Sequence, residues 1–470
     1  MSPGKRVRVA DVVRRRRTPR LDAVSVFAVV IPLVTVGVLA LVRQPPVTDR
    51  IQPPALTRLT SATVVCPAPA PGSPDAWVST AGGRSGDVAV SGGAARSSIP
   101  VRPGAVSRVK GSGAPVLEGR DALAPGLLGL RSGTAPLTSQ PCSVPASAQW
   151  FTGLGAGADH DSVIELVNPD AGSADADITL YGSHAFTARK LHGITIPAHR
   201  TISLDLGTIV PRRQLLSAQV QVTRGRLAVH VLDSRTNLVT HQVRREWLPR
   251  QDEPARDNLL LGLPKGKGAR TLQLANPGEE VVRAQVKVVT GDTSFAPAGL
   301  NTVTVPAGGT TSVSLTKVLT KALGDGAVGV EVTADGAVTA SLLTDLGTDE
   351  AFTVAAPVIR EGAATLLPVA PGKHATPVTA TLYVSADSAG AATVTAYDAS
   401  GKKLLRKRVG EQHGHTSALR LPKGTAFLRV VPQSTQIRGA VLLTGDGASV
   451  VPLRELLTRG LVPQISPGLD

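Results

Sequence analysis

The chain has 470 residues, of which 42% are hydrophobic and only 3% aromatic, and its formal net charge at pH 7 is +15. This length suits about three domains, and the apolar content is enough for sizeable cores. Cores rich in aromatic side chains are excluded. Val, Leu, Ile and Ala therefore have to fill the interior, which favours β-sheet.

The first 42 residues predict a membrane anchor. Residues 1–22 contain eight Lys and Arg side chains against two Asp, and residues 23–42 contain no charge. Such a span predicts a single transmembrane helix, because it can cross a hydrocarbon core about 30 Å thick. We expect a basic cytoplasmic tail over 1–22 and the bulk of the chain outside the cell. A cleaved signal peptide ending at Ala40 is the alternative. Because the basic residues adjoin the span, no nucleic-acid partner is expected.

Two regions follow the predicted anchor. Paired prolines over 43–60 predict an extended spacer, and short strand-like pieces over 61–142 predict an N-terminal β-region with a flexible loop near 92–133. The two cysteines, Cys66 and Cys142, both lie beyond the anchor. In an oxidising compartment such a pair predicts a disulfide, with a metal site or two free thiols as alternatives.

A strand phrase recurs down the rest of the chain. It reads Leu166-Val167-Asn168-Pro169, then Leu274-Ala275-Asn276-Pro277 and, more loosely, Leu382-Tyr383-Val384-Ser385. Each copy continues into an alternating apolar run and a glycine turn. The predicted fold class is therefore mainly β, with tandem immunoglobulin-like β-sandwich domains over 143–254, 255–358 and 359–470.

Finer elements follow from alternation within the copies. Two apolar runs that flank a turn predict a hairpin, over 218–223 and 227–231 in the first copy and over 328–332 and 338–342 in the second. Apart from the anchor, helix is expected only near 319–323 and 454–458.

No motif assembles a reactive site. The glycine-rich segment 324–329 matches a dinucleotide-binding fingerprint, but a helical segment precedes it and a strand follows, which reverses the required order. Ser314 and Lys317 have the spacing of penicillin-binding enzymes without the accompanying motifs. His160, His413 and His415 are assigned to solvated turns. We expect no catalytic, cofactor-binding or metal-ligating residues, and no enzymatic activity.

Basic clusters recur at 212–213, 244–245 and 402–408. They are interpreted as exposed edges or turns, where Lys and Arg prevent a strand from pairing with another chain. Contact with an anionic wall polymer or with lipid headgroups is the alternative.

A set of turn and core residues carries a family resemblance. The set comprises Trp150-Phe151, Gly153, Gly155, Gly157, Leu166, Asn168-Pro169, Tyr181-Gly182 and Ile196-Pro197-Ala198. In these residues the chain resembles the actinobacterial domain-of-unknown-function family 5719, of membrane-anchored secreted proteins. The resemblance implies an extracytoplasmic β-protein without an assigned reaction, associated with cell-envelope glycan machinery.

The leading hypothesis is a single-pass membrane protein whose extracytoplasmic part is a non-enzymatic binding or scaffolding module of the cell envelope. Besides the membrane, its expected partner is an envelope protein or a wall glycan, and no cofactor is expected. The alternative is a divergent envelope hydrolase or transferase with a site between domains. A purely structural spacer is the third hypothesis.

Overall fold

A computed structural model describes residues 23–41, 55–71, 75–92, 96–111, 113–134, 137–186, 188–300, 302–360, 364–366 and 378–462. The chain divides into two units, Met1–Ala55 with Val462–Asp470, and Leu56–Leu461. The predicted cytoplasmic tail over 1–22 and most of the proline-rich spacer lie outside the described residues. Their sequence-based interpretation stays a prediction.

A helix forms where the anchor is predicted. Helix α1 Ala23–Leu41 contains Pro32 and ends one residue before the predicted span does. Among the described residues, however, no helix has both the length and the apolar character required to traverse a membrane. The prediction of a transmembrane helix over 23–42 is corrected accordingly.

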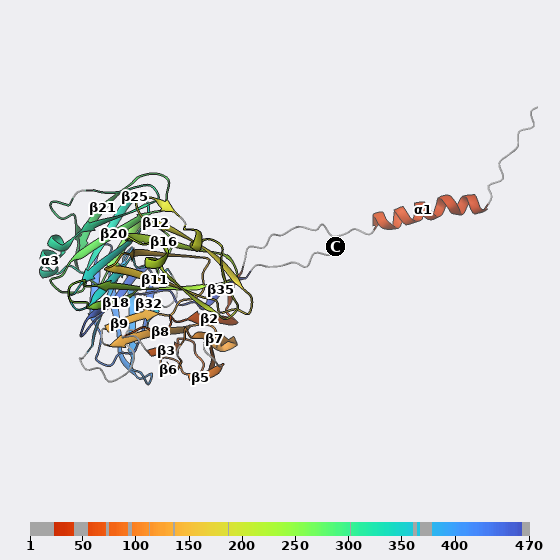
Figure 1. The fold of residues 1–470 in the computed structure, drawn as a ribbon. Coiled ribbons are helices and arrows are strands. Elements are labelled where there is room, and N and C mark those ends of the chain that lie inside the picture. Colours follow the sequence, from red (N-terminus) through yellow and green to blue (C-terminus); the bar gives the residue numbers. More distant parts are fainter. Residues whose placement is uncertain are drawn as a thin grey trace, which may run out of the picture. The chain divides into compact units, whose positions relative to one another are not determined.

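Four consecutive groups of strands make up the unit Leu56–Leu461 (Figure 1). In the first group, two four-stranded sheets, β2-β7-β4-β5 and β6-β3-β8-β9, enclose an aliphatic core. The segment 92–133, assigned to a flexible loop from the sequence, buries Leu117 and Leu130. The elements are β2 Ser61–Val65, β3 Asp75–Thr80, β4 Gly86–Ser91, β5 Ser97–Val101, β6 Ser107–Val109, β7 Val116–Arg120, η1 Asp121–Leu123, β8 Leu127–Thr134 and β9 Leu137–Pro141.

The second group is a nine-stranded sheet. Its order is β13-β12-β16-β10-β11-β17-β18, with β14 paired to β12 and β15 to β11. The elements are β10 Ala148–Ala156, β11 His160–Val167, β12 Ala174–Tyr181, β13 Ala185–Phe186, η2 Arg189–Leu191, β14 Ile194–Ile196, β15 Thr201–Asp205, α2 Leu206–Ile209, β16 Arg213–Arg224, β17 Ala228–Thr236 and β18 Val243–Leu248.

The third group is an eight-stranded sheet, β22-β21-β25-β20-β24, with β19 and β26 paired to β25 and β23 to β21. Helix α3 packs Leu319 and Ala322 into its core, where a helix is predicted. The elements are β19 Ala255–Leu261, β20 Arg270–Asn276, β21 Val282–Val289, β22 Ser294–Phe295, β23 Val303–Val305, β24 Gly309–Ser314, α3 Thr316–Gly324, β25 Gly329–Asp345 and β26 Glu350–Val354.

The fourth group again has two four-stranded sheets, β27-β32-β29-β30 and β31-β28-β33-β34. Residues 454–458, predicted as helix, are not helical. A separate two-stranded sheet pairs β1 Ala55–Arg58 with β35 Arg459–Val462. The elements of the group are β27 Ala364–Leu366, β28 Thr379–Ala386, β29 Gly390–Tyr397, β30 Lys403–Glu411, β31 Thr416–Arg420, β32 Phe427–Gln433, β33 Ile437–Thr444 and β34 Ala448–Pro452.

All four groups share one strand pattern, which we call the axial sheet. Its orders are β6-β3-β8-β9, β15-β11-β17-β18, β24-β20-β25-β26 and β31-β28-β33-β34. The repeated phrases at 166, 274 and 382 fall on β11, β20 and β28, which hold the same place in this pattern. Strand β3 holds that place in the first group, so the fold contains a fourth copy that the phrase does not mark.

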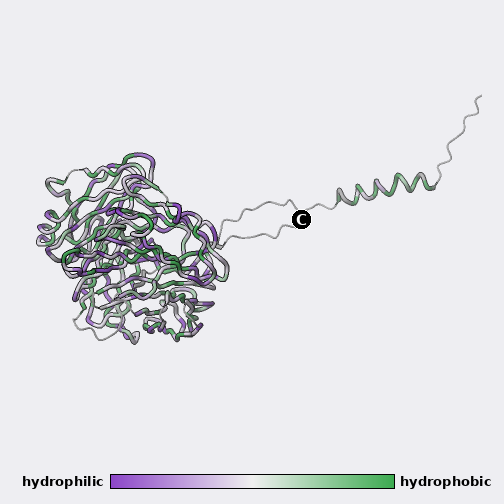
Figure 2. The backbone as a smooth tube through the Cα atoms, viewed as in Figure 1, coloured by the Kyte–Doolittle hydropathy of each residue, from purple (hydrophilic) through white to green (hydrophobic). Residues whose placement is uncertain are grey.

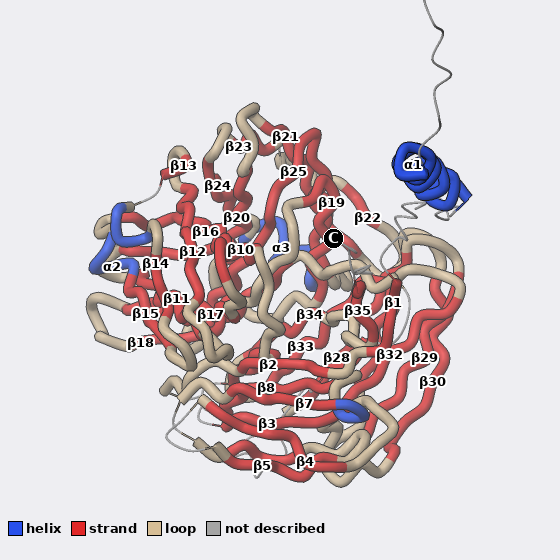
Figure 3. The backbone as a smooth tube through the Cα atoms, turned by 90° about the vertical axis from the view of Figure 1, so that its right-hand side faces the viewer, coloured by secondary structure: helices blue, strands red, loops and turns tan. Residues whose placement is uncertain are grey.

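The axial sheets close into a ring. The last strand of each, which we call the axial strand, contacts two others: β9 contacts β18, β18 contacts β26, β26 contacts β34, and β34 contacts β9. Between the first and fourth groups, the backbone N–H of Ser139 on β9 donates to Ser449 Oγ on β34 at 3.1 Å. Four sheet groups around one axis resemble a four-bladed β-propeller (Figure 3).

Aliphatic and aromatic side chains join neighbouring groups. Val116 and Val167 share a cluster between the first and second groups, and Phe352 of the third group enters the core of the second. Leu261 packs with Val450 between the third and fourth groups. The ring is completed by a cluster in which Trp77 and Leu130 of the first group pack with Phe427 of the fourth.

The predicted row of tandem immunoglobulin-like sandwiches is therefore wrong, although the mainly β class is confirmed. Burial does alternate along the strands, as along β28 and β21. Hydrophilic and hydrophobic residues are accordingly interspersed along the backbone (Figure 2). Alternation shows which face of a strand is buried, but it does not show which strand or sheet lies against that face. The exact limits of the predicted domains stay an interpretation of the sequence.

The predicted hairpins are also wrong. Strand β16 pairs with β10 and β12, whereas β17 pairs with β11 and β18. In the third group, the two predicted strands are one strand, β25, whose first half pairs with β19 and β21 and whose second half pairs with β20 and β26. The chain therefore passes into the axial sheet where the sequence indicates a reversal.

The asparagines of the repeated phrase fasten two turns together. Asn276 Nδ2 lies 2.7 Å from Glu280 O and 3.1 Å from Pro306 O, and its Oδ1 accepts from Gly278 N. Asn168 makes the equivalent contacts in the second group. Both side chains are buried. The amide therefore holds the Asn-Pro turn against the Pro-Ala turn, which explains why both motifs recur together.

Asn276→Ala is expected to lower the free energy of unfolding by about 2–3 kcal/mol, because buried carbonyl groups lose their donor. Urea unfolding of the purified chain measures this change. Asn237→Ala, in an exposed turn where the side chain accepts from Val239 N and Thr240 N, is the matched control and should cost less than about 1 kcal/mol. Equal losses in the two variants would contradict the role given to Asn276.

Candidate functional site

The axial strands end at a pocket, which we call the axial pocket. Its volume is about 300 Å³, and a proline from the end of each group lines it: Pro141, Pro249, Pro357 and Pro452. Proline cannot donate to a neighbouring strand, so it suits the point where each group stops pairing. The pocket is therefore a product of ring closure.

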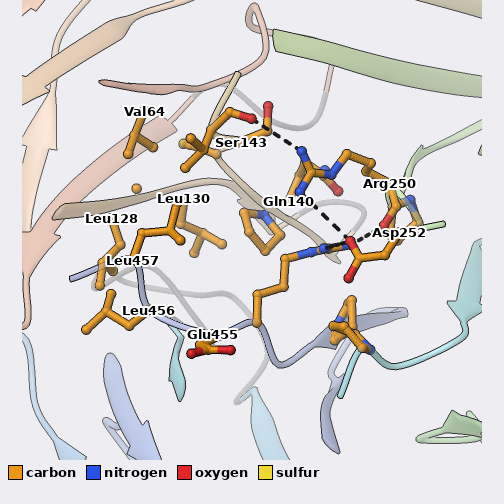
Figure 4. A pocket seen from close by; sticks show the side chains of 18 of the residues that line it. Val64, Leu128, Leu130, Gln140, Ser143, Arg250, Asp252, Glu455, Leu456 and Leu457 are labelled. Atoms are coloured by element: carbon orange, nitrogen blue, oxygen red, sulfur yellow. Dashed lines mark hydrogen bonds and ion pairs between the residues drawn. The ribbon is translucent and has the colours of Figure 1, made fainter. Parts of the chain in front are cut away.

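One wall of the axial pocket is apolar and the other is charged (Figure 4). The charged wall carries Arg250 and Asp252, and Glu455 lies apart from these two; Arg454 belongs to the same wall through its hydrogen bond to Asp252. The apolar wall comprises Val64, Leu127, Leu128, Leu130, Leu456 and Leu457. Apolar walls with a few convergent polar groups are typical of ligand sites.

Two guanidinium groups share one carboxylate in the charged wall. Arg454 Nη1 donates to Asp252 Oδ1 at 2.6 Å, and its Nη2 donates to Arg250 O. Arg250 Nη2 lies 4.0 Å from the same Asp252 oxygen. Arg250 also donates through Nη1 to Val144 O at 3.3 Å, the one hydrogen bond that its side chain makes among the described residues. Because a guanidinium has five N–H donors, Arg250 can bind a further acceptor.

Burial tunes the ionisation of this wall. Burial, together with the charge of Arg454, lowers the pKa of Arg250 to about 10, so Arg250 remains a cation at neutral pH. Burial raises the pKa of Asp252, but the charge and hydrogen bond of Arg454 outweigh it and leave that pKa below its usual value. The wall therefore keeps two cations and one anion at neutral pH.

The disulfide expected between Cys66 and Cys142 is present, and Cys142 lines the axial pocket. It ties the end of β2 to the end of β9. Gly129 lies directly beside it, because a side-chain carbon at position 129 would approach Cys142 Sγ to 2.8 Å. The covalent bond therefore fixes one wall of the pocket.

A Ser-His-Glu chain lies next to the pocket, across the junction of the first and second groups. Ser143 Oγ is 2.9 Å from His230 Nε2, and His230 Nδ1 is 3.3 Å from Glu165 Oε1. The same Nε2 lies 3.2 Å from Val65 O. A carbonyl oxygen can only accept, so this contact requires a proton on Nε2. A ring protonated there cannot take the proton of Ser143, as a nucleophile's base must.

The contacts of Ser143, His230 and Glu165 instead join the first and second strand groups. Both carboxylate oxygens of Glu165, in the second group, accept from Ala68 N of the first, at 3.0 and 3.2 Å. His230 and Glu165 are buried. The arrangement therefore holds the wall that carries Ser143 and Cys142 in place.

Buried carboxyl groups surround the axis between the second and third groups. Glu246 lies on β18, and Asp349 and Glu350 lie at the start of β26. Burial raises the pKa of all three, to about 6 for Asp349 and about 8 for Glu350. Arg235 Nε lies 3.3 Å from Glu350, but desolvation outweighs this ion pair. Glu350 is therefore largely protonated at neutral pH.

His160, assigned to a solvated turn from the sequence, is buried. Its Nε2 lies 2.9 Å from Asp233 Oδ1. Burial would raise the pKa of Asp233, but His160, Arg235 and a hydrogen bond from Ser162 outweigh it and lower the pKa. The hydrogen bond from Ser162 Oγ is made to the same oxygen, Asp233 Oδ1. The assignment fails because the histidine begins β11 and points at a carboxylate far along the chain.

The other residues considered as candidate sites in the sequence do not line the axial pocket. Segment 324–329 follows α3 and precedes β25, which confirms the turn interpretation. His413 is exposed, whereas Arg244, from a cluster assigned to exposed edges, is half-buried and pairs with Asp345. In the described ranges, no group of three His, Cys, Asp or Glu side chains could hold a metal ion. Arg250 and Arg454 were not identified from the sequence, since 204 residues separate them.

Comparisons with known proteins give one family. A model described as "Family of unknown function (DUF5719)" matches residues 122–422, more than half of the chain. No curated protein matches. Among solved structures, the crystal structure of Streptomyces avermitilis α-L-rhamnosidase complexed with L-rhamnose has 10% identity and a TM-score of 0.11. That alignment covers 82% of this chain and 57% of the other, and so low a TM-score does not indicate a shared fold.

Glu350→Gln is expected to stabilise the protein at pH 8.5 by on the order of 1–2 kcal/mol and to change little at pH 5. With the pKa raised from 4.5 to about 8, the stability due to this carboxyl is complete below pH 4.5 and is lost as the pH rises through about 8. Urea unfolding at the two pH values measures the effect.

Glu331→Gln is the control, because Glu331 forms a surface ion pair with Lys287. Its effect should be the same at both pH values within about 0.5 kcal/mol. A Glu350→Gln effect that does not change with pH would contradict the protonated state of Glu350.

Proposed function

We propose a function for a protein that belongs to DUF5719, a family of unknown function: it is an extracytoplasmic, non-enzymatic binding module whose ligand occupies the axial pocket. The match confirms the family resemblance drawn from the turn and core residues. The observation that carries the proposal is that Arg250 and Arg454 share the carboxylate of Asp252 opposite a wall of leucines.

The extracytoplasmic location is supported by the disulfide. Disulfides form and persist in oxidising compartments and are rare where glutathione keeps thiols reduced. Cys66 and Cys142 are the only cysteines of the chain, and both are bonded. The bond encloses the first strand group, so folding of that group depends on the redox state.

The chemistry of the pocket supports an amphipathic ligand with a carboxylate or phosphate group. Arg250 has donors to spare, and the planar guanidinium binds such groups through two parallel hydrogen bonds. The leucine wall would bury an apolar part of the same ligand. Both walls are held by the disulfide and by the Arg454–Asp252 ion pair, so the ligand would meet a site that is already formed.

A second candidate function is hydrolysis, which the order Ser143, His230, Glu165 favours. The contact between His230 Nε2 and Val65 O argues against it, because the proton sits on the nitrogen that would have to act as the base. The two functions differ in one observable. A hydrolase turns over an ester, and a binding module does not.

Decanoate is a suitable probe, since it joins a carboxylate to an apolar chain. We expect isothermal titration calorimetry to show tighter binding of decanoate than of decanol. Arg250→Gln should weaken decanoate binding about tenfold, because it removes a charged hydrogen-bond donor. Arg226→Gln, at a surface arginine paired with Asp170, should leave binding unchanged.

Equal affinity for decanoate and decanol, or no effect of Arg250→Gln, would overturn the proposed site. Hydrolysis of 4-nitrophenyl decanoate by the wild-type chain tests the second candidate. Turnover that Ser143→Ala abolishes, while thermal stability is retained, would favour the hydrolase over the binding module.

A further inference from the structure

The outer sheet of the fourth group carries a second hollow, which we call the basic groove. It lies on the face of β29, β30 and β32, three strands that run side by side (Figure 3). Its volume is about 330 Å³. The lining residues used below are Thr395, Tyr397, Lys403, Arg406, Arg429 and Gln433. No residue lines both this groove and the axial pocket.

Strand register places the cations of the basic groove around one threonine. Thr395 on β29 is directly opposite Arg406 on β30 and directly opposite Arg429 on β32. Strands are about 4.8 Å apart, so the two arginines begin about 10 Å from each other. Tyr397 lies two residues further along β29, opposite Lys403. Three cations therefore surround a strip of neutral side chains.

No carboxylate balances these charges. Lys403, Arg406 and Arg429 are exposed, none of the residues that line the groove is acidic, and within the described part of the chain none of the three cations makes an ion pair. Some exposed arginines elsewhere do have a carboxylate partner, as Arg226 has in Asp170. The groove is therefore a concentrated positive surface that an anion can neutralise.

Edge protection explains only part of this surface. Strand β30 is at the edge of the sheet β27-β32-β29-β30, and Lys or Arg on such a strand deters pairing with other chains. Arg429 is on β32, an interior strand flanked by β27 and β29. An interior strand has no free edge to protect. Arg429 therefore needs another explanation.

The cations are spaced for a chain of charges. Arg406 and Arg408 are two residues apart on β30, so their side chains face the same side at an interval of roughly 7 Å. They lie opposite Thr395 and Thr393 of β29. A linear polymer with charges at intervals would contact several of them at once, and the contacts would add as avidity rather than require one tight site.

Neutral groups in the groove suit sugar hydroxyls. Thr395 and Gln433 offer hydroxyl and amide groups, which both donate and accept hydrogen bonds. Tyr397 is half-buried, and its ring lies 5.7 Å from that of Phe427, which fixes its orientation. A fixed aromatic ring between hydrogen-bonding groups presents an apolar surface beside polar partners.

We propose that the basic groove binds a linear anionic glycan, a sugar chain with carboxylate or phosphate groups. Arg406, Arg429 and Lys403 contact its charges, and the threonines, Gln433 and Tyr397 contact its sugar rings. This site is separate from the axial pocket, and neither proposal depends on the other.

Fluorescence anisotropy with labelled oligogalacturonate tests the proposal on the full-length chain. We expect binding that weakens as NaCl is raised, and no binding of neutral dextran of equal length. Arg429→Gln should weaken binding about fivefold and flatten the slope of log affinity against log salt by about one. Arg406→Gln should behave alike. Arg256→Gln, at an exposed strand arginine of the third group, is the matched control and should change neither quantity.

Three results would overturn the proposal. The first is equal binding of oligogalacturonate and dextran. The second is an Arg429→Gln variant that binds like Arg256→Gln while both keep the wild-type unfolding temperature. The third is equal or tighter binding of single-stranded DNA or of anionic phosphatidylglycerol vesicles, which would make the groove a general polyanion surface. Arg250→Gln should leave glycan binding unchanged, so failure of the axial-pocket proposal is distinguishable from failure of this one.

Discussion

The structure depends on closure of the ring by the axial strands β9, β18, β26 and β34. Each strand group can bury one face of its axial sheet within itself, but the strand at the end of that sheet has to be covered by other groups. The contact from Ser139 to Ser449 joins parts of the chain 310 residues apart. Closure of this kind slows folding, because the entropy of a long loop has to be lost before the last contact forms.

Closure also explains the polar groups at the axis. Glu246, Asp349 and Glu350 lie where axial strands meet, and Asp349 Oδ2 accepts from Ala448 N of the fourth group. Burial keeps these carboxyl groups from ionising freely, as their raised pKa values show. The axial pocket lies where the same four strands end. Each group ends there in a proline, and Arg454 donates a hydrogen bond to Arg250 O.

Part of this could be predicted from the sequence. Period-two alternation identified the strand segments, the glycine turn after α3 was correct, and the single cysteine pair gave the disulfide. The Asn-Pro phrase identified two equivalent strands, β11 and β20, because its amide serves a local turn, and local turns leave a sequence signature. Strand β28 lacks Asn-Pro and was identified by the looser phrase at 382. Strand β3 was missed because its sequence, Asp75–Thr80, contains no form of the phrase.

The rest could not be predicted, because it depends on contacts between distant segments. Strand β25 is continuous and pairs with β21 through its first half and with β20 through its second half. The alternation of its residues is the same as that of a hairpin, so the sequence does not distinguish the two. Arg250 and Arg454 look like ordinary surface residues until the ring brings them to one carboxylate. Arg429 lies outside the basic clusters seen in the sequence, and only the sheet order places it on an interior strand close to Arg406.

A cross-link between the first and fourth groups tests ring closure most directly. In a Ser139→Cys and Ser449→Cys double variant, the closed ring predicts a disulfide between the new cysteines after mild oxidation, seen as a linked peptide by mass spectrometry of a non-reduced digest. The native Cys66–Cys142 peptide in the same digest reports that oxidation worked. Recovery of the native linked peptide without the engineered one would contradict the ring and favour strand groups that stand in a row.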